Sequence, residues 1–239
     1  MTDTIRNTIN TFPCGFVFTP RDFPIDQKKQ ASVNRILNNM VAAGQISRLC
    51  KGRFYKPQIT ESCELLPNML EIIKDLIEKD EKQIGYITGC TVFNEFKLTT
   101  QIYNVLQIGT LKVKKAIKRG NYQIHFVKQK NVITKDNIQL LQLLDCLRLF
   151  KKIRNITPNQ ECKRLLRLLQ NLDDRQKSEI KLLAIKYPPQ TIALLGAMLE
   201  TLNSQEDTTM LLNELNPQTT YKLGISDSVL LNQKKWNIR

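Results

Sequence analysis

Residues 46–57 read ISRLCKGRFYKP, two short runs of strand-forming residues on either side of a Lys-Gly turn. This pattern predicts a β-hairpin, because Gly52 supplies the positive φ that a tight turn between twisted strands requires. A hairpin does not need charge in order to fold, yet this one has four cations and no acid: Arg48, Lys51, Arg53 and Lys56. The excess indicates a negatively charged partner.

Three helical segments are predicted before the hairpin. Residues 2–12 place apolar side chains at helical spacing, and the PCG of residues 13–15 ends that segment. Thr19 and Pro20 are of the types preferred at the start of a short helix. Asp26 is expected to cap a third helix that runs to Gly44, and its apolar face consists of Val33, Ile36, Leu37, Met40 and Val41.

Helix, short helix, helix and hairpin is the order of a winged helix-turn-helix, in which the third helix enters the major groove of DNA. We therefore predict such a domain over residues 1–60. Arg and Asn suit guanine and adenine, the lysines at the helix start suit phosphates, and the cations of the wing suit phosphates or a minor groove. The predicted DNA-binding residues are Lys28, Lys29, Ser32, Arg35, Asn38, Asn39, Arg48, Lys51 and Arg53.

Charge favours DNA as the partner of this domain. Residues 27–58 contain seven Lys and Arg residues and no acid, within a chain of net charge +14. Such clustering builds a positive field that suits a polyanion. The alternative is that the winged helix serves as a protein-interaction or dimerisation module.

The remaining chain predicts an acidic linker helix over residues 61–82 and a larger C-terminal domain over residues 83–239. Branched and aromatic residues indicate strands near 101–109 and 121–129, and helical patterns dominate from residue 134 on. Thr157 and Asp173 are expected to begin two of these helices. The predicted fold class is α+β and mostly helical, with an N-terminal winged helix followed by an α/β-to-helical domain.

Two features of the C-terminal domain leave alternatives open. Residues 112–119 form either a second nucleic-acid surface or a solvated segment, and the cations concerned are Lys112, Lys114, Lys115, Lys118 and Arg119. Asp145 lies in the apolar run LLQLLDCLRLF, where an unpaired carboxylate would be costly. Asp145 is therefore either a structural residue paired with Arg148 or a catalytic one.

Several classes of protein are disfavoured by the sequence. No apolar run approaches the roughly 20 residues of a membrane span, and the N-terminus does not resemble a signal peptide, so a cytoplasmic protein is expected. The six cysteines form no CxxC and His125 is the single histidine, so we expect reduced thiols and no metal. Gly85 and Gly89 fit neither the GxGxxG pattern nor the P-loop pattern of nucleotide-binding proteins, and no cofactor is predicted.

Two motifs in order resemble the AbiEi-type antitoxins of bacterial abortive-infection, or type IV toxin–antitoxin, systems. The first is the wing pattern G-x-I-x-R-x-x-x-G-x-x-Y, formed by Gly44, Ile46, Arg48, Gly52 and Tyr55. The second opens the larger domain and is formed by Gly85, Thr88, Gly89, Leu98, Thr99, Thr100 and Gln101. The resemblance covers about residues 1–153, and the tail is similar to a related subgroup. Family members often have a simpler C-terminal end, which leaves residues 154–239 open to another role.

This resemblance implies a transcriptional autorepressor that binds repeats in its own promoter and opposes a nucleotidyltransferase-type toxin without a stable complex. It implies no catalytic activity. One rival hypothesis is a nucleic-acid-processing enzyme with a winged-helix targeting domain. That enzyme would need clustered carboxylates, whereas residues 82–160 contain three acids, Glu95, Asp136 and Asp145, at no recognisable metal spacing.

Overall fold

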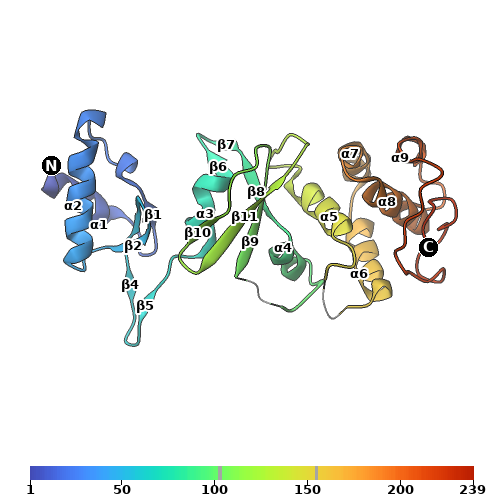
Figure 1. Cartoon of the computed structure of the whole chain (residues 1–239), viewed down its shortest axis with the longest axis horizontal. Coiled ribbons are helices and arrows are strands. Elements are labelled where there is room, and N and C mark those ends of the chain that lie inside the picture. The colour runs from blue at the N-terminus through green and yellow to red at the C-terminus, as the bar shows by residue number, and fades with distance from the viewer. Residues whose placement is uncertain (102–103, 154–155) are drawn as a thin grey trace. The chain divides into compact units, whose positions relative to one another are not determined.

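The structure is a computed structural model of the chain that describes residues 1–101, 104–153 and 156–239 (Figure 1). It is an α+β fold. The chain divides into two compact units, the first made of residues 1–76 and 116–124 and the second of residues 77–115 and 125–239. The first unit extends beyond the predicted domain boundary at residue 60, because it also includes most of the expected linker helix and residues 116–124.

The first unit begins with helices around a small sheet. Helix α1 (Thr2–Thr11) is followed by strand β1 (Val17–Phe18), by the 3-10 helices η1 (Pro20–Asp22) and η2 (Gln27–Lys29), and by helix α2 (Gln30–Ala42). Strands β2 (Ser47–Cys50) and β3 (Arg53–Tyr55) form the predicted hairpin. The sheet order is β1-β3-β2, so the strand that precedes α2 pairs antiparallel with the last strand of the hairpin.

The core of this unit lies between α1, α2 and the sheet. Ile5, Phe18, Val33 and Leu37 have no exposed surface, and Phe54 from the hairpin joins them. The rings of Phe18 and Phe23 meet edge to face with centroids 5.9 Å apart. The helical spacing in the sequence is therefore confirmed as a buried face, and burial of these apolar side chains is the main stabilising contribution.

Local signals place the helix starts, with one exception. The Thr19 hydroxyl accepts a bond from the Arg21 amide, and the Asp22 carboxylate accepts one from the Thr19 amide, which completes a capping box at η1. Asp26 accepts a bond from the Lys28 amide at 3.0 Å and so caps η2. The prediction that Asp26 caps the long helix was wrong, because a 3-10 turn intervenes before α2.

The rest of the first unit follows the hairpin. Strands β4 (Gln58–Ile59) and β5 (Glu64–Leu65) pair with each other, and helix α3 (Met69–Ile77) forms within the expected acidic stretch. Strand β10 (Ile117–Arg119) pairs with the start of β11 (Tyr122–Lys128). Strand β11 lies where the sequence predicts a strand, and its second half belongs to the second unit.

The second unit combines a sheet with a group of helices. Strand β8 (Gly85–Thr88) pairs antiparallel with β9 (Val105–Thr110) in this sheet, whereas β6 (Glu78–Lys79) and β7 (Lys82–Gln83) pair only with each other. The strand expected at 101–109 begins later than predicted, and residues 102–103 lie outside the described residues. The helices are α4 (Cys90–Glu95), α5 (Ile138–Arg148), α6 (Pro158–Gln170), α7 (Asp174–Ala184), α8 (Pro189–Leu202) and α9 (Thr209–Asn213).

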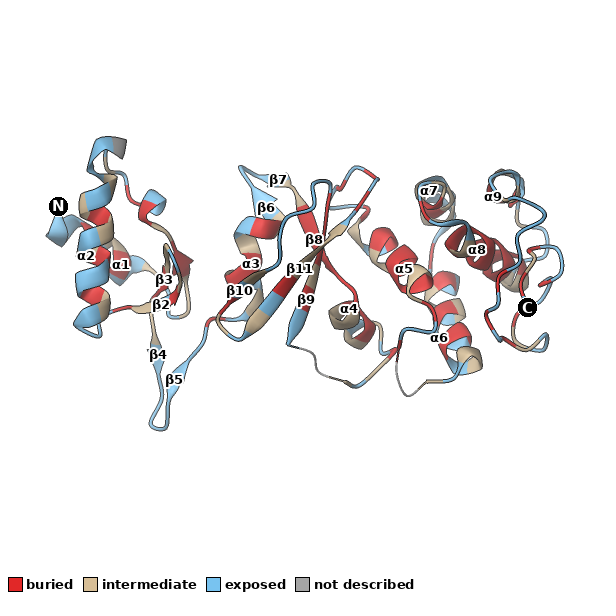
Figure 2. Ribbon diagram, viewed as in Figure 1, coloured by how far each residue is buried: buried red, intermediate tan, exposed pale blue. Residues whose placement is uncertain are grey.

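Helix α8 is the centre of the helical group, and Figure 2 shows it buried along most of its length. It packs against α5, α6, α7 and α9. Thr157 and Asp173 begin α6 and α7 with capping boxes, as predicted. The C-terminal residues return to α8, where the fully buried Trp236 donates a hydrogen bond to Glu200 at 3.1 Å. Within the described residues, no helix is both long and apolar enough to cross a bilayer.

Candidate nucleic-acid interface

The outer side of η2 and α2 carries most of the residues predicted to contact DNA. Ser32 is half-buried, and the others on these elements are exposed, namely Lys28, Lys29, Arg35, Asn38 and Asn39. Val33, Leu37 and Met40 occupy the opposite side of α2 and are buried. The amphipathic pattern therefore leaves this polar side turned to solvent, and no acid lies between residues 27 and 58 to neutralise it.

Asn39 has a position different from that of its neighbours. It lines a hollow between α1 and α2 together with Arg6 and Gln45. Arg35 and Asn38 do not line this hollow. The surface that could meet a nucleic acid is therefore centred on Arg35 and Asn38, with Asn39 at its edge.

The hairpin places a cation against the exposed side of α2. The Nη2 atom of Arg48 donates a hydrogen bond to Oδ1 of Asn38 at 2.6 Å. The guanidinium of Arg48 also lies 5.7 Å from the centre of the Phe54 ring. These contacts restrict the Arg48 side chain, so that α2 and β2 present one continuous polar face.

The turn of the hairpin is built as the sequence predicts. Gly52 has φ +72°, and no atom lies within 4 Å of a Cβ added there, so backbone conformation alone selects glycine. Lys51 is exposed in this turn. Lys56 is used inside the unit instead, since its Nζ donates to the carbonyl oxygens of Asn10 and Phe12 at 2.9 and 2.8 Å. It thereby satisfies carbonyls at the end of α1.

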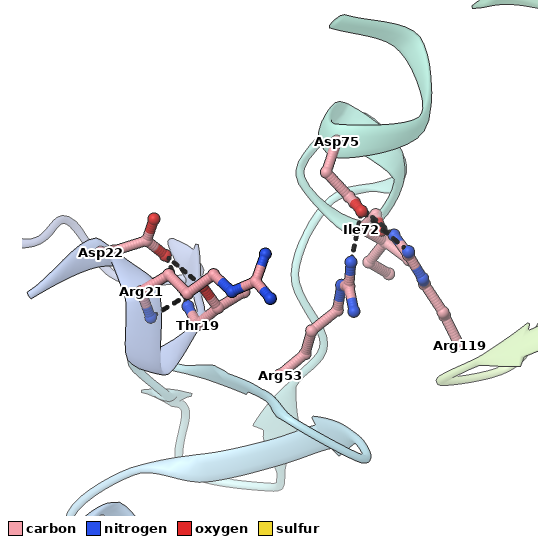
Figure 3. A network of polar contacts seen from close by, with 7 residues as sticks. All are labelled: Thr19, Arg21, Asp22, Arg53, Ile72, Asp75 and Arg119. Atoms are coloured by element: carbon pink, nitrogen blue, oxygen red, sulfur yellow. Dashed lines mark hydrogen bonds and ion pairs between the residues drawn. The ribbon is translucent and has the colours of Figure 1, made fainter. Parts of the chain in front are cut away.

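Arg53 is held in an internal ion pair. Its guanidinium binds the carboxylate of Asp75 on α3, which also binds Arg119 of β10 (Figure 3). The side chain of Arg53 is 25% exposed, compared with 4% for Arg119. The prediction that Arg53 faces DNA in the same way as Arg48 and Lys51 therefore needs correction, because part of its charge is already neutralised.

Asp75 stays ionised between these two arginines. Partial burial acts to raise the pKa of Asp75, but the hydrogen bonds and charges of Arg119 and Arg53 outweigh it and lower that pKa. Arg119 donates to both carboxylate oxygens, at 2.5 and 3.0 Å, and to the carbonyl of Ile72 at 2.7 Å. Charge pairing thus ties β10 to α3 within the first unit.

The second predicted basic surface is only partly a surface. Lys112, Lys114, Lys115 and Lys118 are exposed, whereas Arg119 is buried against α3. The placement of Arg119 on an exposed basic surface was wrong, because Asp75 compensates its charge. Asp75 itself was missed, since it lies 44 residues from Arg119 and no local pattern connects the two.

The second motif of the sequence has structural roles that the geometry explains. The Thr88 hydroxyl donates to Asp145 at 2.6 Å. Gly89 has φ +70°, and a Cβ there would overlap the side chain of Gln107. Arg164 donates to the carbonyls of Lys97 and Leu98 at 2.9 and 3.0 Å. These contacts hold the turn between β8 and α4 and the segment after α4.

Asp145 is enclosed by donors. Its carboxylate accepts hydrogen bonds from Tyr86 at 2.7 Å, Thr88 at 2.6 Å and Tyr187 at 3.2 Å, and Arg148 pairs with it at 3.1 Å. The residue is 2% exposed, and burial raises the pKa of its carboxyl even though Arg148 opposes this. Asp145 therefore has the contacts of a structural residue paired with Arg148, which is one of the two alternatives that the sequence left open.

The described residues contain no group of three or more His, Cys, Asp or Glu side chains placed to hold a metal. All six cysteines are free thiols, and Cys146 and Cys162 are buried. The arrangement that stands out in the first unit is therefore electrostatic: an exposed polar helix face, extended by Arg48 and Lys51 of the hairpin.

Comparison with known proteins gives a family and a fold. A model described as a family of unknown function (DUF6088) matches residues 4–180. No curated protein matches the chain. The RV2827C protein from Mycobacterium tuberculosis, known from a crystal structure, is similar in fold, with a TM-score of 0.61 and 9% sequence identity over 99% of this chain and 90% of that chain.

Proposed function

We propose that this chain, which belongs to the DUF6088 family of unknown function, is a DNA-binding transcriptional regulator. In this proposal the first unit is a winged helix-turn-helix, with α2 as the recognition helix and the β2–β3 hairpin as the wing. The order of elements and the sheet order β1-β3-β2 support this assignment.

The observation that carries the proposal is the joint face of α2 and the hairpin. Arg35 and Asn38 are exposed side chains on one face of a helix, and Asn38 is bonded to Arg48 of the wing. Such a helix fits the major groove, where Arg can pair with guanine and Asn with adenine. The absence of acids from residues 27–58 removes the repulsion that would oppose a phosphate backbone.

The division of labour among the cations follows from their contacts. Lys28, Lys29 and Lys51 are exposed and contact phosphates in this proposal. Arg53 contributes less to DNA binding than Arg48 does, because Asp75 already pairs with it. Asp75 thereby sets which wing arginine is available to the nucleic acid.

The biological role that we propose is that of an autorepressing antitoxin, acting on the promoter of its own operon in a type IV toxin–antitoxin system. The wing pattern through Gly52 and the later pattern through Gly89 support this role by their resemblance to AbiEi-type antitoxins. Its toxin would be a nucleotidyltransferase that it opposes without a stable complex. The proposed location is the cytoplasm, and the proposal includes no enzymatic activity and no cofactor.

Fluorescence anisotropy with a labelled duplex from upstream of the gene tests the DNA-binding step. If about six phosphates are neutralised, affinity falls on the order of a thousandfold between low and moderate salt. The double variant Arg35→Gln, Lys51→Gln should weaken binding at least about tenfold and reduce the slope of log K against log salt by about one, because only Lys51 is assigned to a phosphate.

The matched control is Lys163→Gln, Lys234→Gln, which removes the same charge from exposed lysines of the second unit. It should leave both affinity and salt slope close to those of the unmodified chain. Equal losses in the two double variants would show that net charge and not this face governs binding. A salt-independent affinity would exclude the proposal altogether.

A further inference from the structure

A small cationic hollow lies in the second unit, where the end of β11 meets the start of α8. Its volume is about 110 Å³, and it is lined by Lys128, Gln129, Lys130, Arg148, Lys186, Tyr187 and Pro188. Four of these seven residues are cations and none is an acid. Asp145 pairs with Arg148, but the three lysines have no such partner, and their clustering is unfavourable without an anion to offset it.

The three lysines of the hollow are available to a ligand. Lys128, Lys130 and Lys186 are exposed, and no hydrogen bond or ion pair joins their side chains to the described part of the chain. Lys128 and Lys130 flank the buried Gln129 in the sequence, where β11 ends. All three residues line the hollow.

The inner wall of the hollow is rigid. The Gln129 amide donates to the hydroxyls of Tyr86 and Tyr187 at 2.7 and 2.8 Å, and its carbonyl accepts from the Asn131 amide at 2.8 Å. Tyr187 in turn donates to Asp145 at 3.2 Å. These bonds connect the wall to the buried polar network of the second unit, so its shape does not depend on a ligand.

Arg148 is the cation that this network orients. Its Nη2 atom pairs with Asp145 at 3.1 Å, and its guanidinium lies 5.9 Å from the centre of the Tyr187 ring. The Arg148 side chain is 24% exposed. One edge of the planar guanidinium is thus fixed by Asp145, while the group still borders the hollow, an arrangement suited to a tetrahedral oxyanion.

We propose that this hollow binds one phosphate group, as inorganic phosphate or as the phosphomonoester end of a small molecule. The volume admits a phosphate but is well below the roughly 300 Å³ of a pocket for a drug-sized ligand. The 14-residue helix α8 begins at Pro189 beside the hollow, and its N-terminal end adds partial positive charge. A phosphomonoester is favoured over a backbone phosphodiester because it brings more negative charge to three lysines that have no acidic partner.

Isothermal titration of the full chain with inorganic phosphate tests this site. Saturable binding is expected, and the triple variant K128Q/K130Q/K186Q should weaken it at least tenfold. The matched triple variant K163Q/K222Q/K234Q removes the same charge from exposed lysines elsewhere in the second unit and should stay within twofold of the unmodified chain. The lysines of the hollow make no internal bonds, so the first variant should fold normally.

A second variant separates geometry from charge. Arg148→Lys keeps a cation for Asp145 but removes the planar group, and it should weaken phosphate binding while the thermal midpoint changes little. Absence of saturable phosphate binding, or equal weakening in both triple variants, would overturn the proposal. The proposal would also be overturned if the K128Q/K130Q/K186Q variant kept its affinity for inorganic phosphate but lost affinity for a DNA duplex that has no terminal phosphate groups. DNA binding by α2 is measured separately and can fail or succeed independently.

Discussion

Arg119 of β10 and Asp75 of α3 form a two-bond ion pair in which the arginine is 4% exposed and the aspartate 41% exposed. The pair joins segments 44 residues apart, and Arg53 of the hairpin shares the same carboxylate. Asp75 therefore both holds β10 against α3 and neutralises part of the charge of the hairpin residue Arg53.

Replacing Asp75 with Asn should lower the free energy of unfolding by about 2 kcal/mol. This value lies between the cost for an exposed pair and that for a fully buried one, because Arg119 is buried and Asp75 is half-exposed. Urea denaturation measures the change. Arg53→Gln, which removes only the more exposed partner, serves as a control and should cost well under half as much.

Acid titration adds a second test of the same carboxylate. Since its folded pKa is lowered, the stability from Asp75 is present above the pKa of the unfolded chain and is lost as pH falls through the folded pKa. The Asp75→Asn variant should therefore lose less stability than the unmodified chain on acidification below about pH 4. Parallel pH profiles for the two proteins would contradict this role.

Glu161 should make the second unit less stable as pH rises towards neutrality. It is 1% exposed, with Oε2 accepting from the Lys151 amide at 3.1 Å and no hydrogen-bond partner for Oε1 in the described part of the chain. Burial raises its pKa from 4.5 to about 7. The folded state thus holds a proton that the unfolded chain releases, so stability is full below 4.5 and is lost as pH rises towards 7.

The Glu161→Gln variant should remove this loss, which is on the order of 3 kcal/mol for such a pKa difference. Thermal melts at pH 5 and pH 8 measure it, with the exposed Glu214→Gln as the control. A midpoint difference between the two pH values that is the same in both variants would show that another group is responsible.

Asp145→Asn should destabilise the second unit by about 3 kcal/mol. The change leaves Arg148 without its carboxylate and gives three hydroxyl donors a poorer acceptor. Chemical denaturation followed by circular dichroism gives the value. Asp136→Asn, an exposed position in the preceding turn, should remain within about 0.5 kcal/mol of the unmodified chain.

Gly196→Ala should loosen the C-terminal segment. A Cβ at residue 196 of α8 would overlap the ring of Trp236, a fully buried residue of the C-terminal segment. Overpacking of this kind costs about 1–3 kcal/mol. Trp236 is the single tryptophan, so a red shift of its fluorescence would report displacement directly. Gln190→Ala on the same helix should leave the emission unchanged.

Asn38→Asp should weaken DNA binding at least about tenfold if α2 is the recognition helix. A carboxylate would then lie beside Arg48, in the centre of a face that has no acid. Anisotropy with the upstream duplex measures the effect. Gln218→Glu makes the same change of charge on an exposed loop of the second unit and should have little influence.

Features that depend on neighbours in the chain could be predicted. Thr19, Thr157 and Asp173 begin their helices as expected, because a cap bonds to an amide two or three residues away. The hairpin turn at Gly52 was likewise confirmed by its positive φ. Asp26 shows the limit of such signals, since a cap fixes where a turn starts but not whether that turn is α or 3-10.

The sequence by itself thus determined the α+β class, the buried faces of its helices and the polar, acid-free side of α2. Only the tertiary structure decided which charged side chains remain available to a ligand. Arg53 and Arg119 are paired through Asp75, and the segment with Lys128 and Lys130 meets Arg148 of α5 and Lys186 between α7 and α8. The physical reason is range: caps and amphipathic faces are set within a few residues, whereas ion pairs and hollows form between residues that only the packed chain brings together.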